Sequence, residues 1–143
     1  MSDRCFVDTN ILLYAHDASA GEKHRRARTL VEHLWNTRSG VISTQVLQEF
    51  AVNLRRKVDP PVDPTEVRSI IADYLTWTVV TNSGEAILDA LDIESQHHLS
   101  FWDSLIIAAA ERAGTATLYS EDLNHGQRYG TVTVINPLAD HQP

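Results

Sequence analysis

Short, mostly apolar strand-like runs alternate with helical patterns along this chain, and this alternation constrains its fold most strongly. The strand-like runs lie at residues 4–7, 41–43, 78–80, 117–119 and 132–135. Apolar residues repeat with helical spacing between these runs. Strands that alternate with helices imply right-handed crossovers and a parallel sheet that is covered on both faces. Short apolar strands are typical of such a buried sheet, so we expect an α/β fold.

Local signals predict where several helices begin and end. Three patterns have capping spacing and predict helix starts: Asp63 with Pro64, Asn82 with Glu85, and Ser100 with Asp103. Gly114 is expected to end the helix that Ser100 begins. The proline-rich segment DPPVDP at 59–64 is too short for an interdomain linker and indicates a break between helices.

The composition bounds the class of protein. At 143 residues, the chain is long enough for one domain, residues 1–143, with a real core. A single cysteine excludes an intrachain disulfide. The sequence contains no apolar run of membrane length and no signal-peptide pattern, so we expect a cytoplasmic protein without membrane association. The net charge of −7 argues against broad electrostatic binding of nucleic acid, although it allows a nucleic-acid enzyme with an acidic pocket.

Four acidic residues stand at the edges of apolar segments: Asp8, Glu49, Asp103 and Asp122. A carboxylate beside buried aliphatic side chains is costly unless it is paired or binds a cation. Asp8 and Asp122 follow the first and fourth strand-like runs, and ligands of parallel sheets bind outside these strand ends. The positions of Glu49 and Asp103 are compatible with the same edge. Oxygen ligands favour Mg²⁺ or Mn²⁺ over Zn²⁺, and such a pocket can hydrolyse a phosphodiester.

Each acid also has an ordinary structural interpretation. Asp8 and Asp122 could form Asx turns, Asp103 could be the capping partner of Ser100, and Glu49 could be a solvated helix residue. As a group, the acids are harder to explain in this way. Neutral groups stand beside them and could orient carboxylates or metal-bound waters: Thr9, Asn10 and Ser120.

Four segments resemble the PIN-domain family, and in particular the VapC-type toxins of bacterial toxin–antitoxin pairs. They are VDTNILLYA (7–15), STQVLQEF (43–50), FWDSLIIAAAERAG (101–114) and TLYSEDLNHGQ (117–127), and the closing VTVINP (132–137) also fits. The resemblance covers almost the whole chain. It implies a single PIN-like domain over residues 1–143, with three layers, α/β/α, around a short central parallel sheet of about five strands. In one departure, Leu138 follows Asn136-Pro137 where many relatives have an aromatic residue.

The resemblance also implies a divalent-metal-dependent endoribonuclease that is controlled by a VapB-like antitoxin and forms a homodimer. The site acids carried over from the family are Asp8, Glu49, Asp103 and Asp122, with Thr9 and Ser120 at its polar positions. Asp8 and Asp103 would hold the primary Mg²⁺ or Mn²⁺. Glu49 and Asp122 would complete the shell through waters or help to hold a second ion. With water as the nucleophile, the expected RNA ends are a 5′-phosphate and a 3′-hydroxyl.

Other charged and titratable residues have weaker claims to function. Arg25, Arg26 and Arg28 are interpreted as the solvated face of a helix, with phosphate contact as the alternative. Arg112 could reach a phosphate or a nearby carboxylate. The histidines are not expected to act as catalysts: His97 and His98 diverge on a helix, and His125 lies in a loop, where substrate contact is the alternative.

Three alternative functions remain open at this stage. A metal-dependent phosphatase could use Asp8 as its phosphoryl acceptor, although Asn10 stands where such enzymes have a second Asp. A DNA nuclease could use the same acids. A non-catalytic RNA- or protein-binding PIN module is the alternative outside enzymes, and the presence of all four acids argues against it.

Overall fold

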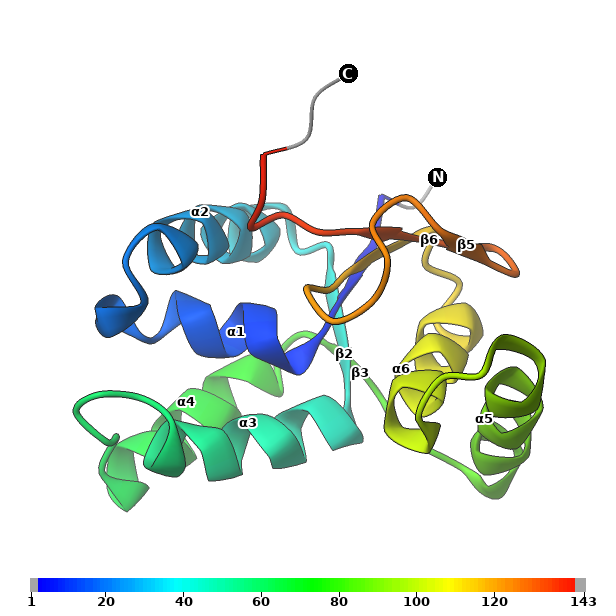
Figure 1. The fold of residues 1–143 in the computed structure, drawn as a ribbon. Coiled ribbons are helices and arrows are strands. Elements are labelled where there is room, and N and C mark those ends of the chain that lie inside the picture. Colours follow the sequence, from blue (N-terminus) through cyan, green and yellow to red (C-terminus); the bar gives the residue numbers. More distant parts are fainter. Residues whose placement is uncertain (1–2, 141–143) are drawn as a thin grey trace.

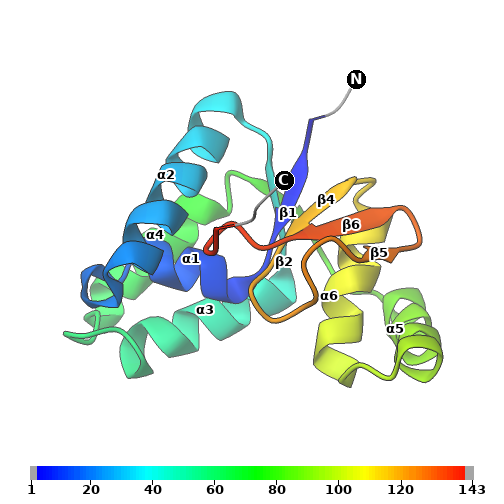
Figure 2. The ribbon, with the colours of Figure 1, turned by 45° about the horizontal axis from the view of Figure 1, so that its top comes forward.

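The computed structural model describes residues 3–140, which form a six-stranded sheet flanked by helices (Figures 1 and 2). The strands are β1 (Cys5–Val7), β2 (Gly40–Ser43), β3 (Thr78–Val80), β4 (Thr117–Tyr119), β5 (Arg128–Tyr129) and β6 (Val132–Ile135). Their order is β3-β2-β1-β4-β6-β5, and only the β5–β6 pair is antiparallel. The expected parallel sheet is confirmed, but the estimate of about five strands missed β5. That strand has only two residues and carries no apolar run.

The helices form two layers around the sheet. They are α1 (Thr9–Ala15), the 3₁₀ turn η1 (Ala18–Ala20), α2 (Glu22–Thr37), α3 (Thr44–Arg56), α4 (Pro64–Tyr74), α5 (Gly84–His97) and α6 (Phe101–Arg112). Figures 1 and 2 show α1 to α4 on one side of the sheet and α5 and α6 on the other. The expected α/β/α layering is therefore confirmed. Between residues 3 and 140, no helix is long and apolar enough to cross a membrane.

The helix ends follow the capping chemistry of the sequence with one exception. Asp63 caps α4 with Pro64 in its first turn, and the Ser100 hydroxyl accepts a 3.0 Å hydrogen bond from the Asp103 N–H at the start of α6. Gly114 takes a positive φ of 71° just after α6, as a helix stop requires. The expected cap of α5 was wrong by one residue, because Ser83 and not Asn82 accepts from the third helical N–H.

The core lies on both faces of the central strands and continues into an aromatic cluster under α1 to α4. Phe6, Ile42 and Leu118, from three neighbouring strands, have no exposed surface. The aromatic cluster consists of Phe50, Tyr74, Trp35 and Trp77, with neighbouring ring centroids 5.1 to 5.5 Å apart. Such tilted and edge-to-face packing stabilises more than buried area alone. Because Trp35 lies on α2 and Phe50 on α3, the cluster positions the helix before β2 and the helix after it.

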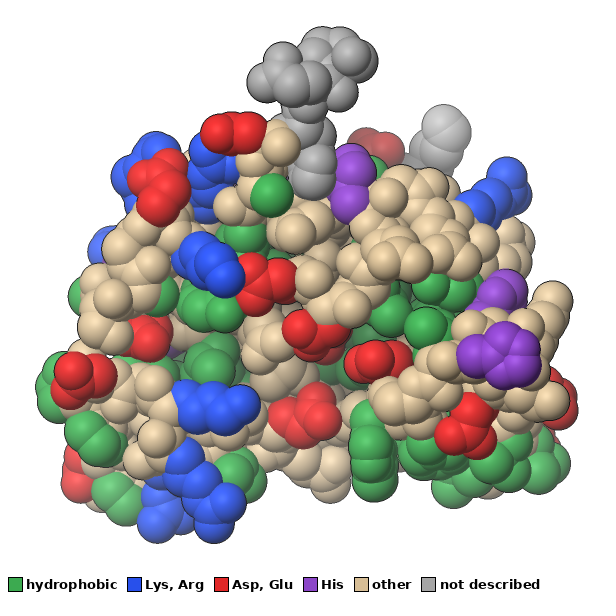
Figure 3. All heavy atoms as spheres, in the orientation of Figure 1, with side chains coloured by type: hydrophobic (Ala, Val, Ile, Leu, Met, Phe, Trp, Pro, Cys, Tyr) green, Lys and Arg blue, Asp and Glu red, His purple; other side chains and the backbone are tan. Residues whose placement is uncertain are grey.

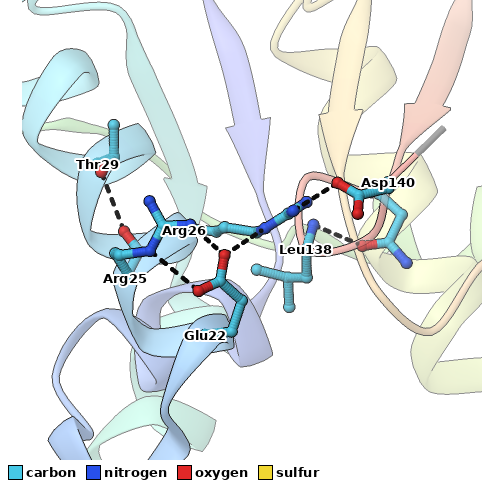
Figure 4. A network of polar contacts seen from close by, with 7 residues as sticks. Glu22, Arg25, Arg26, Thr29, Leu138 and Asp140 are labelled. Carbon is cyan, nitrogen blue, oxygen red and sulfur yellow. Dashed lines mark hydrogen bonds and ion pairs between the residues drawn. The ribbon is translucent and has the colours of Figure 1, made fainter.

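A surface network ties the last described segment of the chain to α2 (Figure 4). Glu22 pairs with both Arg25 and Arg26, and Arg26 extends a second bond of 2.5 Å to Asp140. Beside it, the Leu138 N–H donates to the Asn136 side chain, and Leu138 itself is buried. An aliphatic residue therefore fills the position where an aromatic one was noted in relatives.

Gly40 offers a test of this packing, because a side chain there would collide with the aromatic cluster. An added Cβ would lie 2.4 Å from the Trp77 ring, which is itself held by neighbouring rings. We expect Gly40→Ala to lower the free energy of unfolding by about 1–3 kcal/mol in urea denaturation. Gly84→Ala, at the start of α5 with open space around it, is the matched control and should not destabilise. Equal stabilities for the two variants would contradict this account.

Candidate active site

The central strands place the site where the strand order reverses: the chain adds β2 and β3 on one side of β1 and then β4 on the other. Strand β1 has β2 on one side and β4 on the other, and both pairs are parallel. The register pairs Val7 with Tyr119, so the residues that follow these strands, Asp8 and Ser120, leave the sheet side by side. Ligands of open parallel sheets bind at such a switch point. The topology therefore predicts a site at this edge from the backbone alone.

Asp8 is the most enclosed acid of the site. It caps α1, and its side chain is only 5% exposed. Its two carboxylate oxygens accept separate hydrogen bonds, one from the Thr9 N–H at 2.7 Å and one from the Ser120 hydroxyl at 2.8 Å. Ser120 is fully buried and its oxygen also accepts from the Asp122 N–H at 3.2 Å. Both donors are neutral, so they fix the Asp8 carboxylate without cancelling its charge.

The first residues of α1 hold two further acids. The Thr9 hydroxyl donates to Glu49 Oε1 on α3 at 2.7 Å, and the Asn10 amide donates to Asp122 Oδ2 in the β4–β5 loop at 2.8 Å. These segments are 40 and 112 residues away from α1 in sequence. The three residues that the sequence suggested as neutral supports therefore each contact an acid of the group.

Asp103 completes the group from the first turn of α6, on the opposite side of the sheet from α1. Its negative charge raises the pKa of both Asp8 and Asp122, which places the three carboxylates within interaction range. The structure thus places Asp8, Asp103 and Asp122 within electrostatic range of one another, and it joins Glu49 to this group through its hydrogen bond with Thr9, the residue after Asp8. Figure 3 shows acidic side chains gathered in the middle of this face, between the α1–α3 side and α6.

Burial and repulsion act together on these carboxylates. Desolvation raises the pKa of Asp8 to about 7, and the charges of Asp122 and Asp103 add to the effect against the two hydrogen bonds. The pKa of Asp122 is also raised, mainly by burial and then by Asp103 and Glu121. Across residues 3–140, none of the four acids forms an ion pair with a basic side chain. The site therefore concentrates uncompensated negative charge.

The donor chemistry of this site fits a hard divalent cation, since every acidic group offers carboxylate oxygens. Repulsion of this kind is relieved by a bound cation, and the raised pKa of Asp8 reflects that repulsion in part. Within the described residues, however, no three acidic, His or Cys side chains are already arranged as a ligand set. The fit therefore rests on the chemistry and charge of the group rather than on a preformed coordination geometry.

Sequence reasoning missed the contacts of Glu121, the residue before Asp122. The Tyr14 hydroxyl donates to Glu121 Oε1 at 2.9 Å, and Lys23 Nζ pairs with Glu121 Oε2 at 2.6 Å. Asn10 and Tyr14 lie four residues apart on α1, and their partners Asp122 and Glu121 are adjacent in the β4–β5 loop. The helical spacing of Asn10 and Tyr14 was the available signal, because it puts both on one face of α1.

The remaining candidates have structural partners. Arg25 and Arg26 pair with Glu22, and Arg28 pairs with Glu32, as expected for the solvated face of a helix. Arg112 reaches a carboxylate, Asp89 on α5, at 2.7 Å.

The histidines are likewise engaged in structure. The His97 ring packs edge-on against Tyr129, and His98 ends α5 in a left-handed conformation. His125 Nδ1 accepts a hydrogen bond from the Asn136 N–H and so joins its loop to the end of β6. These contacts do not place an imidazole among the four acids.

Comparisons with known proteins agree with this architecture. The sequence matches the PIN domain family over residues 5–129. No match was found among curated proteins. Among solved structures, the fold is similar to VapC20 of Mycobacterium tuberculosis, a toxin that cleaves the sarcin-ricin loop. The TM-score is 0.64 at 20% identity, covering 82% of this chain and 89% of that chain.

Two toxin–antitoxin complexes share the fold as well. A complex from Klebsiella pneumoniae gives a TM-score of 0.67 at 18% identity, covering 93% of this chain and 97% of that chain. The DNA-bound VapBC of Salmonella typhimurium gives 0.66 at 15% identity, covering 94% and 97%. At these identities the likeness shows a common fold.

The raised pKa of Asp8 predicts an unusual pH dependence for the metal-free protein. Between about pH 4 and pH 7, the folded protein retains a proton that the unfolded chain has released. The free energy of unfolding should therefore fall as pH rises through this window, by up to about 1.4 kcal/mol per pH unit from this one group. Urea denaturation in EDTA from pH 4.5 to 7.5 measures the slope.

In the same experiment, Asp8→Asn should flatten the slope, because the amide does not titrate. A residual slope of the same sign is expected from Asp122, whose pKa is also raised. Asp73→Asn, at an exposed position on α4, is the matched control. A slope that is identical in wild type and Asp8→Asn would contradict the assignment of this titration to Asp8.

Proposed function

Because this chain belongs to the PIN domain family, we propose that it is a divalent-metal-dependent endoribonuclease that hydrolyses RNA phosphodiesters as the toxin of a VapBC-type pair. The observation that carries the proposal is the set of four carboxylates from separate segments. Three of them accept hydrogen bonds from neutral donors, and none forms an ion pair within residues 3–140. Carboxylates in a buried position are normally paired with basic side chains or bind a cation, and within residues 3–140 these four form no ion pair.

Within this proposal, the chain's own residues have distinct roles. Asp8 and Asp103 would hold the primary Mg²⁺ or Mn²⁺, with Glu49 and Asp122 completing the site. A bound cation would neutralise negative charge on the phosphodiester and lower the pKa of water. Thr9, Asn10 and Ser120 keep Glu49, Asp122 and Asp8 in fixed orientations through their hydrogen bonds. Such outer contacts commonly contribute about 10–100-fold in metal affinity or activity.

The catalytic test compares RNA cleavage in Mn²⁺, with and without EDTA, for wild type, Asp8→Asn and Asp103→Asn. We expect both variants to lose at least about 100-fold in rate, more than loss of a supporting contact would cost. Far-ultraviolet circular dichroism should remain that of the folded protein, because an amide can replace each carboxylate without a change in volume. Products should carry 5′-phosphate and 3′-hydroxyl ends, since water is the nucleophile.

Asp73→Asn is the matched control and should cleave as wild type does. Full activity in EDTA, or 2′,3′-cyclic phosphate ends, would overturn the hydrolytic metal mechanism. Equal cleavage of DNA would favour the DNA nuclease, and release of phosphate from small monoesters would favour the phosphatase. RNA binding by wild type without any cleavage would favour the non-catalytic module.

The proposed antitoxin partner is a segment with hydrophobic anchors and a basic tip. An apolar groove of about 430 Å³ lies between α3 and α4, with Val52, Val67, Ile71 and Leu75 in its walls. An arginine from the tip could bond bidentately to the uncompensated acids and so compete with the metal. The known VapBC complexes that share this fold support such a partner. We also propose one PIN domain over residues 1–143, a homodimer and a cytoplasmic location.

Co-expression tests the pairing. The chain should be toxic when expressed alone, harmless as Asp8→Ala, and harmless when expressed with the product of the adjacent small reading frame. The Leu75→Asp variant should stay toxic when expressed alone. Co-expression of the partner should protect against it much less, because the hydrophobic anchors of the partner would bury the new charge. Ser69→Asp, at an exposed position of α4 outside the groove walls, should remain protected. A harmless wild-type chain that binds no such partner would contradict the toxin assignment while leaving the nuclease assignment to its own test.

A further inference from the structure

Trp102 is an exposed aromatic residue that directly precedes Asp103, one of the acids of the site. It is 61% exposed, whereas the other two tryptophans, Trp35 and Trp77, pack in the aromatic cluster. Its one described ring contact is with Phe101, edge-on at 5.2 Å. A single exposed aromatic side chain is common on protein surfaces, so the position of Trp102 relative to the acids decides whether it has a function.

The position of Trp102 is fixed relative to two acids. It directly precedes Asp103 on α6. Its backbone carbonyl accepts a 3.2 Å hydrogen bond from the Gln45 amide, and Gln45 lies one helical turn before Glu49 on α3. Gln45 is buried, so this bond joins the first turns of α3 and α6. Trp102 therefore stands where these two helices meet, at the edge of the acidic group.

The opposite edge of the acidic group carries positive charge. Lys57, the C-cap residue of α3, lowers the pKa of Asp122 through its positive charge. Lys23 of α2 lies near the same loop, where it forms an ion pair with Glu121. Figure 3 shows Lys and Arg side chains gathered mainly on the α2–α3 side of the acids, whereas apolar side chains lie on both sides of them. A single nucleic-acid strand that crosses the acids would meet cations suited to its phosphates on one side and an indole on the other.

We propose that Trp102 stacks on an unpaired base adjacent to the scissile phosphate and so positions single-stranded RNA across the four acids. The inference rests on the proposed nuclease function and names how that site holds its substrate. Aromatic side chains next to single-stranded binding sites stack on bases with little sequence preference. The charge distribution favours a nucleic acid here, because the surface combines cations for phosphates with an apolar ring for a base. The exposed Leu88 and Leu91 lie on α5 and form no part of this arrangement.

Binding of RNA without cleavage tests the proposal directly. The probe is an unstructured single-stranded RNA of mixed sequence, added to Asp8→Asn protein in EDTA at low salt. The RNA should quench tryptophan fluorescence, and the quenching should largely vanish in the double variant with Trp102→Phe, since the other two tryptophans are half-buried in the aromatic cluster. Trp102→Phe should nevertheless bind nearly as tightly as its parent, because a phenyl ring also stacks.

Trp102→Leu should weaken RNA binding by about fivefold or more, because it removes the stacking ring and keeps an apolar side chain. An abasic strand of equal length and charge is the matched ligand, and its affinity should be the same with Trp or Leu at position 102. Leu88→Ala, with the same 61% exposure but on α5, is the matched protein control and should bind RNA as its parent does.

Equal RNA affinity for Trp102→Leu and its parent would overturn the inference. So would a Trp102→Leu variant whose only change is a lower mass in sedimentation, because that would make Trp102 a contact between copies of the chain. If wild type cleaves RNA but Trp102→Leu changes no affinity, this inference fails alone. If wild type never cleaves RNA while Trp102 still controls its binding, the nuclease assignment fails and the stacking role stands. Absence of RNA binding in every variant would overturn both.

Discussion

The hydrogen bond from Ser120 to Asp8 is the interaction on which the site depends most, because it joins the ends of the two central strands. Both groups are buried, and the pairing of Val7 with Tyr119 leaves them adjacent at the point where the chain leaves the sheet. The bond fixes one oxygen of Asp8, and the first N–H of α1 fixes the other. The start of α1 is thereby set relative to β4 and to the loop that follows it.

Helix α1, whose first residue is fixed in this way, then holds the other segments of the site through its side chains. Thr9 contacts Glu49, Asn10 contacts Asp122, and Tyr14 contacts Glu121, so three residues of this seven-residue helix bind both α3 and the β4–β5 loop. The helix itself is mostly buried, with Ile11, Leu12 and Leu13 in the core. Its rigidity comes from this packing, since an isolated helix of this length is not stable in water. The core therefore determines the geometry of the carboxylates as well as the stability of the fold.

The sequence predicted the parts of this structure that follow from local patterns. Apolar runs located five strands, and the acids after two of them pointed to one edge of the sheet. Strand β5 was missed because two residues carry no periodicity, and the cap of α5 was misplaced by one residue because Asn82 and Ser83 are both good caps. The Tyr14–Glu121 contact spans 107 residues, and only the folded chain brings such partners together. The placement of the four acids at the edges of apolar segments suggested a shared pocket, and the family resemblance then supplied a role for each acid.

The contrast between two adjacent residues supports a functional explanation for the acidic group. Glu121 is neutralised by Lys23 and also receives the Tyr14 hydroxyl, whereas Asp122 receives only a neutral amide from Asn10 and a partial contribution from Lys57. The chain therefore has basic side chains within reach of this loop and pairs one with the acid outside the group. Leaving Asp8 and Asp122 without ion pairs costs stability, because desolvation and repulsion both raise the pKa values of these two carboxyl groups. A fold tolerates such a cost at a functional site, where a bound cation can offset it.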